Sequence, residues 1–521
     1  MRYGNLSIKW NDMTFNLIKK RKVILFYIFL LSVCIGIFLR IRYLGTNDLW
    51  LDELASIDYA NVKNVFDIFH KLNTFADPNP PMYFLLLHYW LKVFGFTIVS
   101  ARLLSAIFSI ATIAIIYRLT LLISENKELA LLSASFFSLC YGSVYYATAA
   151  RPYAMLIFFG ALFLLTRIKA RYKEKRYIYT LHLLSSVCLA SIELFGTLFV
   201  LCSIIEQTIL FLRRKKTPLF SSQNFLHSII CELIGIFICI IYILINFKLY
   251  NSISHGNHYA PYIDLMFITS TFSEFFSFKA FIVIMLMVFS SYIVFMKYKE
   301  FPEKLKKNDI LQIFIDAGGY ILILVLLIGY LIGISTPILS ERHLLVLLPT
   351  VIIFVSIYIY PLLINTNTSI VFLILFSFFL YSSASFCLQI LESPYRQSFN
   401  YRILGPLLEK YPLVFTTTPK ENIQTYIKLT GIPSKYENKI HLFSNIEKYD
   451  PKNVNHIAIY FSFDLSKTLF FGLMALKKEG YSCKAIQDFG QVKLNDEFRY
   501  LLLVARCDKI QPTQSISSKI D

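Results

Sequence analysis

Long stretches of apolar residues, separated by short polar segments, fill the first three quarters of the chain. They lie at about residues 23–43, 98–123, 128–148, 152–168, 178–193, 195–212, 225–247, 281–296, 310–334, 343–363 and 369–391. A helix needs about 20 apolar residues to cross the hydrocarbon layer of a membrane, and most of these stretches approach or exceed that length. The pattern predicts a multispanning α-helical membrane protein. No small-residue cleavage site follows the first stretch, so we interpret it as an anchor and not as a removed signal peptide.

The composition agrees with this prediction. Of the 521 residues, 56% are hydrophobic and only 16% are charged, whereas an ordinary soluble domain has about 25% charged residues. These proportions exclude a disordered scaffold, a secreted disulfide framework and a conventional nucleic-acid-binding protein. The formal net charge of +18 does not indicate nucleic acid as a partner, because membrane proteins gather Lys and Arg in their cytoplasmic loops.

Clusters of basic residues predict the orientation in the membrane. The sequence Lys-Lys-Arg-Lys at 19–22 precedes the first span, which places the N-terminal tail, residues 1–22, in the cytoplasm. Three further clusters lie at 167–176, 213–216 and 297–307. All three fall on the cytoplasmic side only if the shorter apolar segment at 80–96 lies on the outer surface instead of crossing. This arrangement predicts about eleven transmembrane helices in a domain spanning residues 23–394.

The first outward loop, residues 44–97, differs from the rest of this domain because its acidic residues outnumber its basic ones. Between residues 53 and 72, apolar side chains recur at near-helical spacing, which predicts an amphipathic helix in the membrane interface. Tyr83, Tyr89 and Trp90 are typical of a second surface helix, since such rings settle at headgroup depth. The same scheme places three other loops outside, at 148–151, 248–280 and 335–342.

Residues 395–521 form a separate, outward-facing region. No segment there is apolar enough to span a bilayer. Short β-rich segments at 413–418, 457–463 and 500–505 alternate with helical ones at 401–410, 421–429 and 465–479, which predicts a small extracytoplasmic α/β domain. Cys483 and Cys507 both fall in this domain, and their spacing leaves open whether they form a disulfide. The other seven cysteines lie in or beside apolar stretches and are interpreted as packing residues.

With this topology, most of the unusual polar residues gather at the outer face. Asp52 and Glu53 follow the first span, and the other members of the group lie at the outer ends of later spans: Arg102, Arg151, Glu193, Glu341, Arg342 and His343. Arginines can hold a phosphate through charge-assisted hydrogen bonds. A carboxylate kept ionised beside them can accept the proton of a hydroxyl group. This combination indicates group transfer from a lipid phosphate.

Each of these residues also has a structural interpretation. Asp52 is a good helix cap, and Glu193 is interpreted in the same way. Arg102 and Arg151 would snorkel to lipid headgroups, and His343 would be an interfacial residue with a satisfied hydrogen bond. We interpret the clusters at 167–176 and 213–216 as topology signals. Three acidic residues in the inner halves of their spans are interpreted as helix-packing groups, namely Glu206, Glu232 and Asp316.

Several short motifs resemble those of a known family. Leu49-Trp50-Leu51-Asp52-Glu53 and the segment from Asn79-Pro80-Pro81 to Leu87 resemble the opening loop of the lipid-phosphate-dependent GT-C glycosyltransferases. The branch most similar contains the dolichyl-phosphate-mannose protein mannosyltransferases and the bacterial aminoarabinose transferases of lipid A. Three later segments match the pattern of that branch: Arg102-Leu103, Ala150-Arg151-Pro152-Tyr153-Ala154, and Glu341-Arg342-His343-Leu344-Leu345.

The resemblance implies an inverting glycosyltransferase of the bacterial plasma (inner) membrane. Its partners would be membrane lipids, a polyprenyl-phosphate-linked sugar and an envelope acceptor. Asp52 would be the catalytic base and Glu53 would orient the acceptor. Arg102, Arg151 and Arg342 would bind the donor phosphate, while Tyr153, Glu193 and His343 would line the cavity. The family allows a divalent metal. No cluster with metal-ligand spacing is evident in the sequence, so we assign no residue as a metal ligand.

Two positions depart from the family pattern, because Glu193 replaces a basic residue or His and His343 replaces Tyr. These departures leave the identity of the sugar open. Two other classes of protein compete with the glycosyltransferase interpretation. One is a polytopic transporter or lipid flippase without transferase activity. Such proteins usually show repeated halves and ionisable groups at the bilayer midplane, whereas this chain shows no repeat and concentrates its outward-facing polar groups at one surface. The other is a catalytically silent membrane protein whose C-terminal domain binds a partner.

Overall fold

The computed structural model describes Val23 and residues 25–45, 49–74, 77–172, 175–212, 222–246, 265–298, 307–335, 340–364, 368–392, 404–411, 413–416, 420–430, 432–442, 456–465, 481–488, 491–494 and 497–509. The chain folds into two compact units. The first comprises Met1–Arg42, Phe66–Leu86 and Arg102–Gln389. The second comprises Tyr43–Val65, Leu87–Ala101 and Ile390–Asp521, so it combines parts of the first outward loop with the C-terminal region.

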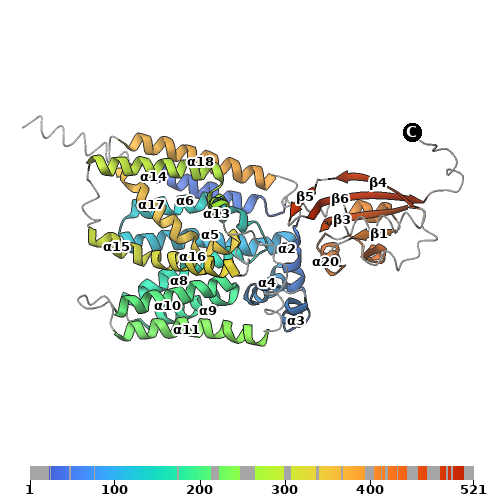
Figure 1. Cartoon of the computed structure of the whole chain (residues 1–521), viewed down its shortest axis with the longest axis horizontal. Helices are drawn as coiled ribbons and strands as arrows, with labels where there is room; N and C mark the ends of the chain where they lie inside the picture. Colours follow the sequence, from blue (N-terminus) through green and yellow to red (C-terminus); the bar gives the residue numbers. More distant parts are fainter. Residues whose placement is uncertain are drawn as a thin grey trace, which may run out of the picture. The chain divides into compact units, whose positions relative to one another are not determined.

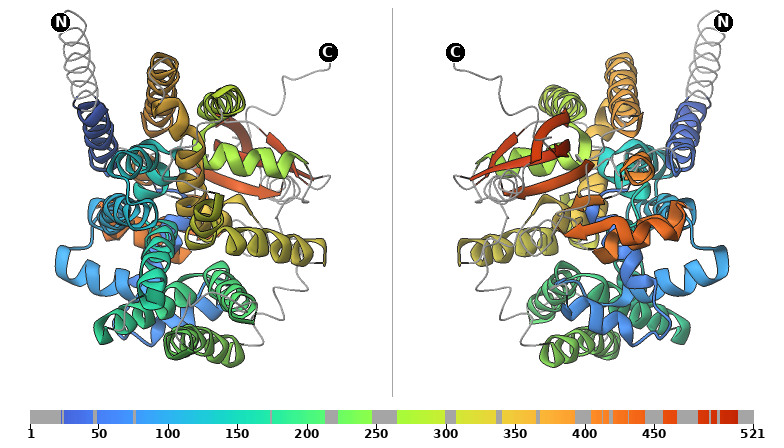
Figure 2. Two further views of the ribbon diagram at one scale, coloured as in Figure 1. Left: turned by 90° about the vertical axis from the view of Figure 1, so that its left-hand side faces the viewer. Right: turned by 90° about the vertical axis from the view of Figure 1, so that its right-hand side faces the viewer.

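The first unit is a bundle of helices (Figure 1). It contains the helix Leu25–Arg42, the short helix α3 (Asp67–Thr74), most of α5 (Ile98–Ser124), α6 (Lys127–Leu139), α7 (Tyr141–Ala147), α8 (Tyr153–Tyr172), α9 (Arg176–Ile192), α10 (Leu194–Leu212), α11 (Ser222–Ile245), α13 (Leu265–Phe276), α14 (Phe278–Tyr298), α15 (Lys307–Asp316), α16 (Gly319–Ser335), the 3-10 helix η1 (Glu341–Leu347), α17 (Leu348–Ile364) and α18 (Ser369–Glu392). Helices α8, α9, α10 and α11 pack side by side on one side of this bundle (Figures 1 and 2).

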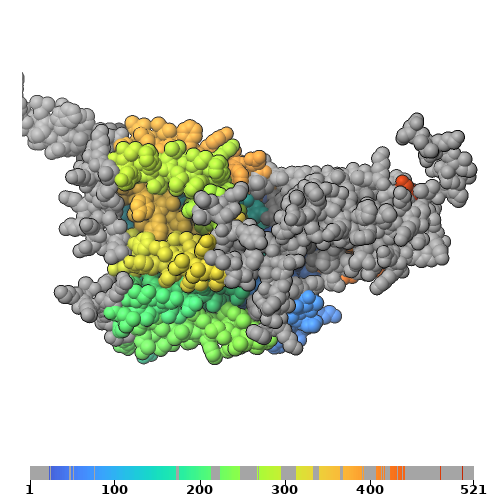
Figure 3. Space-filling model, in the orientation of Figure 1, coloured from blue at the N-terminus to red at the C-terminus, as the bar shows by residue number. Residues whose placement is uncertain are grey.

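Among the described residues, seven helices are long and apolar enough to cross a membrane. The number rises to nine if two bent pairs, α6 with α7 and α13 with α14, each form one span. These pairs bend by 55° and 97°. The chain is therefore a multi-pass helical membrane protein, as predicted. The outer helices α11, α14, α16 and α18 also carry many exposed large apolar side chains, which suit contact with lipid (Figure 3).

The predicted number of eleven crossings is larger than this count. Helices α9 and α16 occupy the two remaining predicted spans, and each has 17 residues. A helix of that length is about 25 Å long, slightly short of a hydrocarbon layer of about 30 Å. Helix α4 (Met82–Phe94), in the segment predicted to lie on the surface, has only 13 residues. It is too short to cross a bilayer unaided.

A buried arginine fastens the first helix to its neighbours. Arg40 is fully buried near the end of the helix Leu25–Arg42. Its guanidinium donates to Ser109 Oγ at 2.8 Å, the Ser138 carbonyl at 2.6 Å and Ser143 Oγ at 2.7 Å. A Cβ at Gly36 would lie only 2.3 Å from the same Ser138 carbonyl, so glycine permits this close approach of the two helices.

The second unit contains α2 (Leu51–Ala60), the last part of α4 and a β-sheet with associated helices. These elements are α19 (Leu404–Lys410), β1 (Leu413–Thr416), α20 (Lys420–Thr430), the 3-10 helix η3 (Ser434–Lys439), β2 (Ile440–Leu442), β3 (His456–Leu465), β4 (Tyr481–Asp488), β5 (Gln491–Leu494) and β6 (Glu497–Lys509). The strand order is β2-β1-β3-β6-β4, with β5 also paired to β6. Strand β1 runs parallel to β2 and β3, whereas β6 is antiparallel to its neighbours.

Three of these strands and two helices occur where the sequence pattern predicts them, whereas the predicted helix at 465–479 lies almost entirely outside the described residues. Cys507 is buried and disulfide-bonded. In the register of β4 and β6, Cys483 is the residue directly opposite it.

Candidate functional site

Two arginines that the sequence singles out converge on one aromatic ring. Arg151 directly precedes α8, Tyr153 is the first residue of α8, and Arg342 lies in η1. The Cζ atoms of Arg151 and Arg342 lie 5.8 Å and 6.0 Å from the centre of the Tyr153 ring. Both distances are within the range of cation–π attraction. Arg151 and Tyr153 are buried, while Arg342 is partly exposed, so two positive charges lie on one aromatic ring at the edge of the packed interior.

Glu193 and His343 form a second predicted pair that the structure brings together. Glu193 is extended, with φ −157° and ψ 152°, and it separates α9 from α10. Its Oε1 atom lies 3.4 Å from His343 Nε2. The His343 ring stacks on Phe195 at 5.1 Å between centroids, and its Nδ1 accepts the Ser340 backbone N–H at 3.2 Å. Because Nδ1 is an acceptor, we assign the ring proton to Nε2, which points it toward Glu193.

The environment of Glu193 makes it an unusual carboxyl group. Burial raises the pKa of Glu193 to about 8, opposed by the positive charges of Arg342 and Arg151 and reinforced by Asp77. At pH 7 the carboxyl is therefore mainly neutral and adds little negative charge beside the two arginines. Asp77 precedes the segment Asn79-Pro80-Pro81 and accepts the Asn79 backbone N–H at 2.9 Å. Its interaction with Glu193 shows that this motif lies near the same site.

Helix α13 adds polar residues that the sequence analysis missed. The Tyr146 hydroxyl donates to Glu274 Oε1 at 2.5 Å, across 128 positions of sequence. The Tyr146 ring also lies 4.7 Å from that of Tyr153. Ser270 Oγ donates to Glu341 Oε1 at 2.6 Å. The only signal for Glu274 in the sequence is an acidic residue in an outward loop, which does not identify a partner.

Arg102 is fully buried on α5. One turn further along, Ser105 Oγ contacts the Arg151 carbonyl oxygen at 3.4 Å. This contact places the N-terminal part of α5 beside the start of α8. The interpretation of Arg102 and Arg151 as one site requires this proximity. A phosphate-binding role for the three arginines stays a prediction.

Asp52 and Glu53 belong to the second unit, in the first turn of α2. The helix begins at Leu51 with Trp50 as N-cap, so the interpretation of Asp52 as the helix cap is wrong. The acidic residue that bonds to the N-cap is Glu53, whose Oε2 accepts the Trp50 backbone N–H at 3.4 Å. Glu53 is fully buried, while Asp52 is partly exposed. Asp52 is thus an acidic residue of the first turn and not the N-cap, and its catalytic role stays a prediction.

In the part of the chain that the structure describes, no three His, Cys, Asp or Glu side chains form a group that could hold a metal ion.

A second polar cluster lies at the other end of α8. Arg167 and Arg171 are buried, and both pair with Glu206 of α10, the second at 3.6 Å. Arg171 also lies 3.4 Å from Asp316 of α15. These two residues of the basic cluster therefore also form buried ion pairs, and the interpretation of the cluster as a topology signal stays a prediction. Their spacing of four places both on one face of α8, toward α10 and α15.

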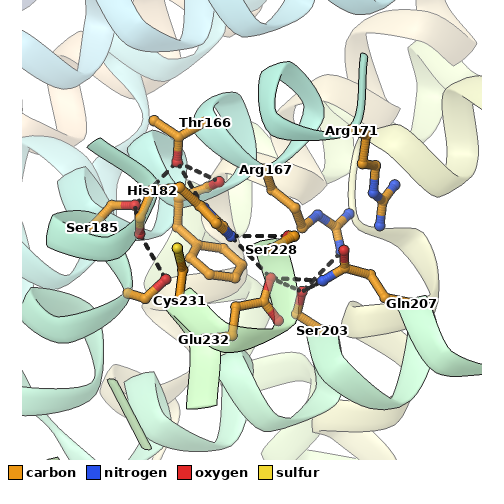
Figure 4. Close-up of polar contacts among 12 residues, drawn as sticks. Thr166, Arg167, Arg171, His182, Ser185, Ser203, Gln207, Ser228, Cys231 and Glu232 are labelled. Carbon is orange, nitrogen blue, oxygen red and sulfur yellow. Dashed lines mark hydrogen bonds and ion pairs between the residues drawn. The ribbon is translucent and has the colours of Figure 1, made fainter. Parts of the chain in front are cut away.

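The same cluster continues to α9 and α11 (Figure 4). His182 Nε2 lies 3.1 Å from Glu232 Oε1, and its Nδ1 lies 3.1 Å from Thr166 Oγ1. Gln207 and Ser203 donate to the same Glu232 oxygen at 2.7 Å and 3.1 Å. These bonds cross from α8 and α9 to α10 and α11, which supports the prediction that Glu206, Glu232 and Asp316 are helix-packing groups.

Comparison with known proteins identifies the fold. A family model described as dolichyl-phosphate-mannose-protein mannosyltransferase matches residues 78–243. Among curated proteins, none matches this chain. The crystal structure of ArnT from Cupriavidus metallidurans in the apo state is similar, with a TM-score of 0.53, 12% identity, and coverage of 92% of this chain and 97% of ArnT. ArnT bound to undecaprenyl phosphate gives a TM-score of 0.52 with the same identity and coverage. The chain shares the fold of ArnT and resembles the branch of GT-C glycosyltransferases that its motifs predict.

Proposed function

We propose that this protein is a glycosyltransferase that moves a sugar from a polyprenyl-phosphate donor to an envelope acceptor. The observation that carries this proposal is the pair of arginines on Tyr153 beside a carboxyl group that is mainly neutral at pH 7. Two guanidinium groups side by side suit one phosphate group, which each can bind through its planar fork of N–H donors. The similarity to ArnT, one structure of which contains undecaprenyl phosphate, supports a lipid-linked donor. The acceptor is a lipid, a glycan or a protein.

The proposed reaction is a single displacement. Asp52 takes the proton of an acceptor hydroxyl, and the oxygen attacks the anomeric carbon of the sugar. The bond between that carbon and the phosphate oxygen breaks, with inversion, and the polyprenyl phosphate leaves with both electrons of the bond. Arg102, Arg151 and Arg342 stabilise the negative charge on the leaving phosphate. Tyr153 holds two of these arginines, while Glu193 and His343 line the sugar side of the cavity.

The position of Glu53 suggests a different role from orienting the acceptor. Its carboxylate faces the Trp50 backbone N–H at the start of α2, so it positions the turn that carries Asp52. Glutamine retains an oxygen that can accept this hydrogen bond. Glu53→Gln should therefore lose less turnover than Asp52→Asn.

The proposed topology places this chemistry outside the cytoplasm. We propose eleven crossings of the plasma membrane, with α9 and α16 included because local thinning or flanking residues accommodate a slightly short helix. The N-terminus would be cytoplasmic, and residues 395–521 would form an extracytoplasmic α/β domain. The Cys507 disulfide is typical of an oxidising compartment and supports this placement.

The deciding experiment is sugar transfer by the purified protein from a polyprenyl-phosphate donor. Mass analysis of envelope glycolipids and glycoproteins in a deletion strain would identify the natural sugar and acceptor. Asp52→Asn should lower turnover by about 100-fold or more, since a general base contributes about 10²–10⁴ in rate. Arg118→Ala is a matched control for Arg102→Ala, because Arg118 is an exposed arginine on the same helix. Normal turnover in Asp52→Asn would refute the assignment of the base, and lipid translocation without transfer would favour a flippase.

A further inference from the structure

Helix α2, which carries Asp52, is packed in the second unit against a helix from the far end of the chain. It contacts α20, a helix of the C-terminal region. The buried face of α2 includes Leu54 and Ile57, and that of α20 includes Ile423 and Ile427. Helix α20 also contacts β2 and η3. It therefore connects the C-terminal sheet region to α2.

One buried hydrogen bond fixes the register between these two helices. Thr425 Oγ1 donates to Asp58 Oδ1 at 2.6 Å, across 367 positions of sequence. Both residues are almost completely buried, at 2% and 4% exposure. A hydroxyl to carboxyl hydrogen bond of this length is well within the normal range and is strongly directional. The apolar contacts alone would allow α2 to slide or rotate, whereas this directional bond specifies one position.

The two ends of α2 are also held. At its start, Glu53 Oε2 accepts the Trp50 N–H. At its end, His88 Nδ1 donates to the Ala60 carbonyl at 2.8 Å, which satisfies one of the carbonyls that a helix terminus leaves without a partner. His88 belongs to α4, in the same unit. The bonds at Asp58 and Ala60 both act on the last turn of α2 and attach it to two different helices, α20 and α4, while the Trp50–Glu53 bond closes its first turn.

We propose that Thr425 and Asp58 are positioning residues for the transfer reaction, and that α20 holds α2 so that Asp52 meets the acceptor. This inference rests on the proposed role of Asp52 as the base. Asp58 lies six residues after Asp52, about 9 Å along a rigid helix, so a displacement at Asp58 is transmitted to Asp52. Misplacement of a reacting group by about 1 Å can cost about 100-fold in rate. The C-terminal region is then part of the catalytic apparatus.

The test is the steady-state kinetics of Thr425→Val, which replaces the hydroxyl by a methyl group of similar size. Turnover should fall by about 10- to 100-fold, while KM for the polyprenyl-phosphate donor should stay within about twofold, because the phosphate is assigned to Arg102, Arg151 and Arg342 and not to Thr425. Thr425→Ser restores the hydroxyl and should restore turnover. Thr430→Val is the matched control, since Thr430 is an exposed threonine on the same helix that bonds to the Tyr426 carbonyl. It should keep normal turnover.

A second variant separates positioning from folding. Thr425→Val leaves the Asp58 carboxylate buried without this donor, which is destabilising. The double variant Asp58→Leu with Thr425→Val removes both partners and should recover thermal stability. It should still lack normal turnover, because the directional bond is gone. Recovery of turnover together with stability would overturn the proposal, as would normal turnover in Thr425→Val.

Asp52→Asn in the same assay distinguishes the two proposals. If Asp52→Asn is inactive and Thr425→Val is normal, only the positioning role is refuted. If Asp52→Asn turns over normally, the base is wrongly assigned and the positioning proposal is refuted with it.

Discussion

Glu193 provides a pH-dependent test of the arginine site. Its carboxyl lies among Arg151, Arg342, Asp77 and His343, and burial raises its pKa from 4.5 to about 8. Below that pH the group is mainly neutral and adds little negative charge beside the arginines. Above it, the ionised carboxylate competes with the phosphate for the same positive charge. Affinity for the lipid donor should therefore fall as pH rises through 8, and not as pH falls.

The size of the effect follows from the titration. With a pKa of about 8, about 9% of the carboxyl is ionised at pH 7 and about 91% at pH 9. If only the neutral form binds donor, the apparent Kd should rise about tenfold over this interval, equivalent to about 1.4 kcal/mol. Arginine remains charged throughout. Glu193→Gln is neutral at every pH and should bind the donor with a nearly constant Kd.

The measurement is donor binding to the purified protein between pH 7 and pH 9, in wild type and Glu193→Gln. Glu125→Gln is a control, because Glu125 is an exposed glutamate and its variant should keep the tenfold change. A Kd that does not change with pH in the wild type would refute the reasoning. An equal change in Glu193→Gln would assign the titration to another group.

Three further predictions concern other parts of the molecule. Arg151→Ala and Arg342→Ala should each weaken donor binding by about 10- to 100-fold, because each loses one charge-assisted bond of about 1.5–3 kcal/mol. Lysine at either position should restore binding only partly, because it lacks the planar fork. Unchanged affinity in both alanine variants would favour a role in contacting lipid headgroups. Glu206→Gln should lower the free energy of unfolding by about 3–5 kcal/mol, because it leaves Arg167 and Arg171 buried without this countercharge. Thermal unfolding in detergent measures this effect, and the control variant Glu125→Gln should unfold like the wild type. Cysteines at Lys63 and Lys448 should react with a membrane-impermeant thiol reagent in intact cells, whereas cysteines at Lys173 and Lys304 should be shielded, and labelling at Lys173 would overturn the topology.

Sequence alone was sufficient for the features that depend on short-range pattern. A run of about 20 apolar residues must be helical in lipid, because every backbone polar group then bonds within the segment. The multispanning fold was therefore predictable without any tertiary information. The motifs around Arg151, Tyr153 and Arg342 likewise stand out locally, and the structure brings these three residues together. The strands β1, β3 and β6 also follow from local composition.

Tertiary structure decided which polar groups meet. The sequence marks Arg167 and Arg171 as basic, but only packing against α10 and α15 makes them buried ion-pair partners of Glu206 and Asp316. Nothing in the sequence relates Tyr146 to Glu274. In the structure Glu274 lies in α13, close to the bend between α13 and α14, and accepts a hydrogen bond from the Tyr146 hydroxyl. Desolvation is likewise a property of the packed protein, so the high pKa of Glu193 has no local signature. The hydrogen bond from Thr425 to Asp58 joins helices separated by most of the chain, and no periodicity encodes such a contact.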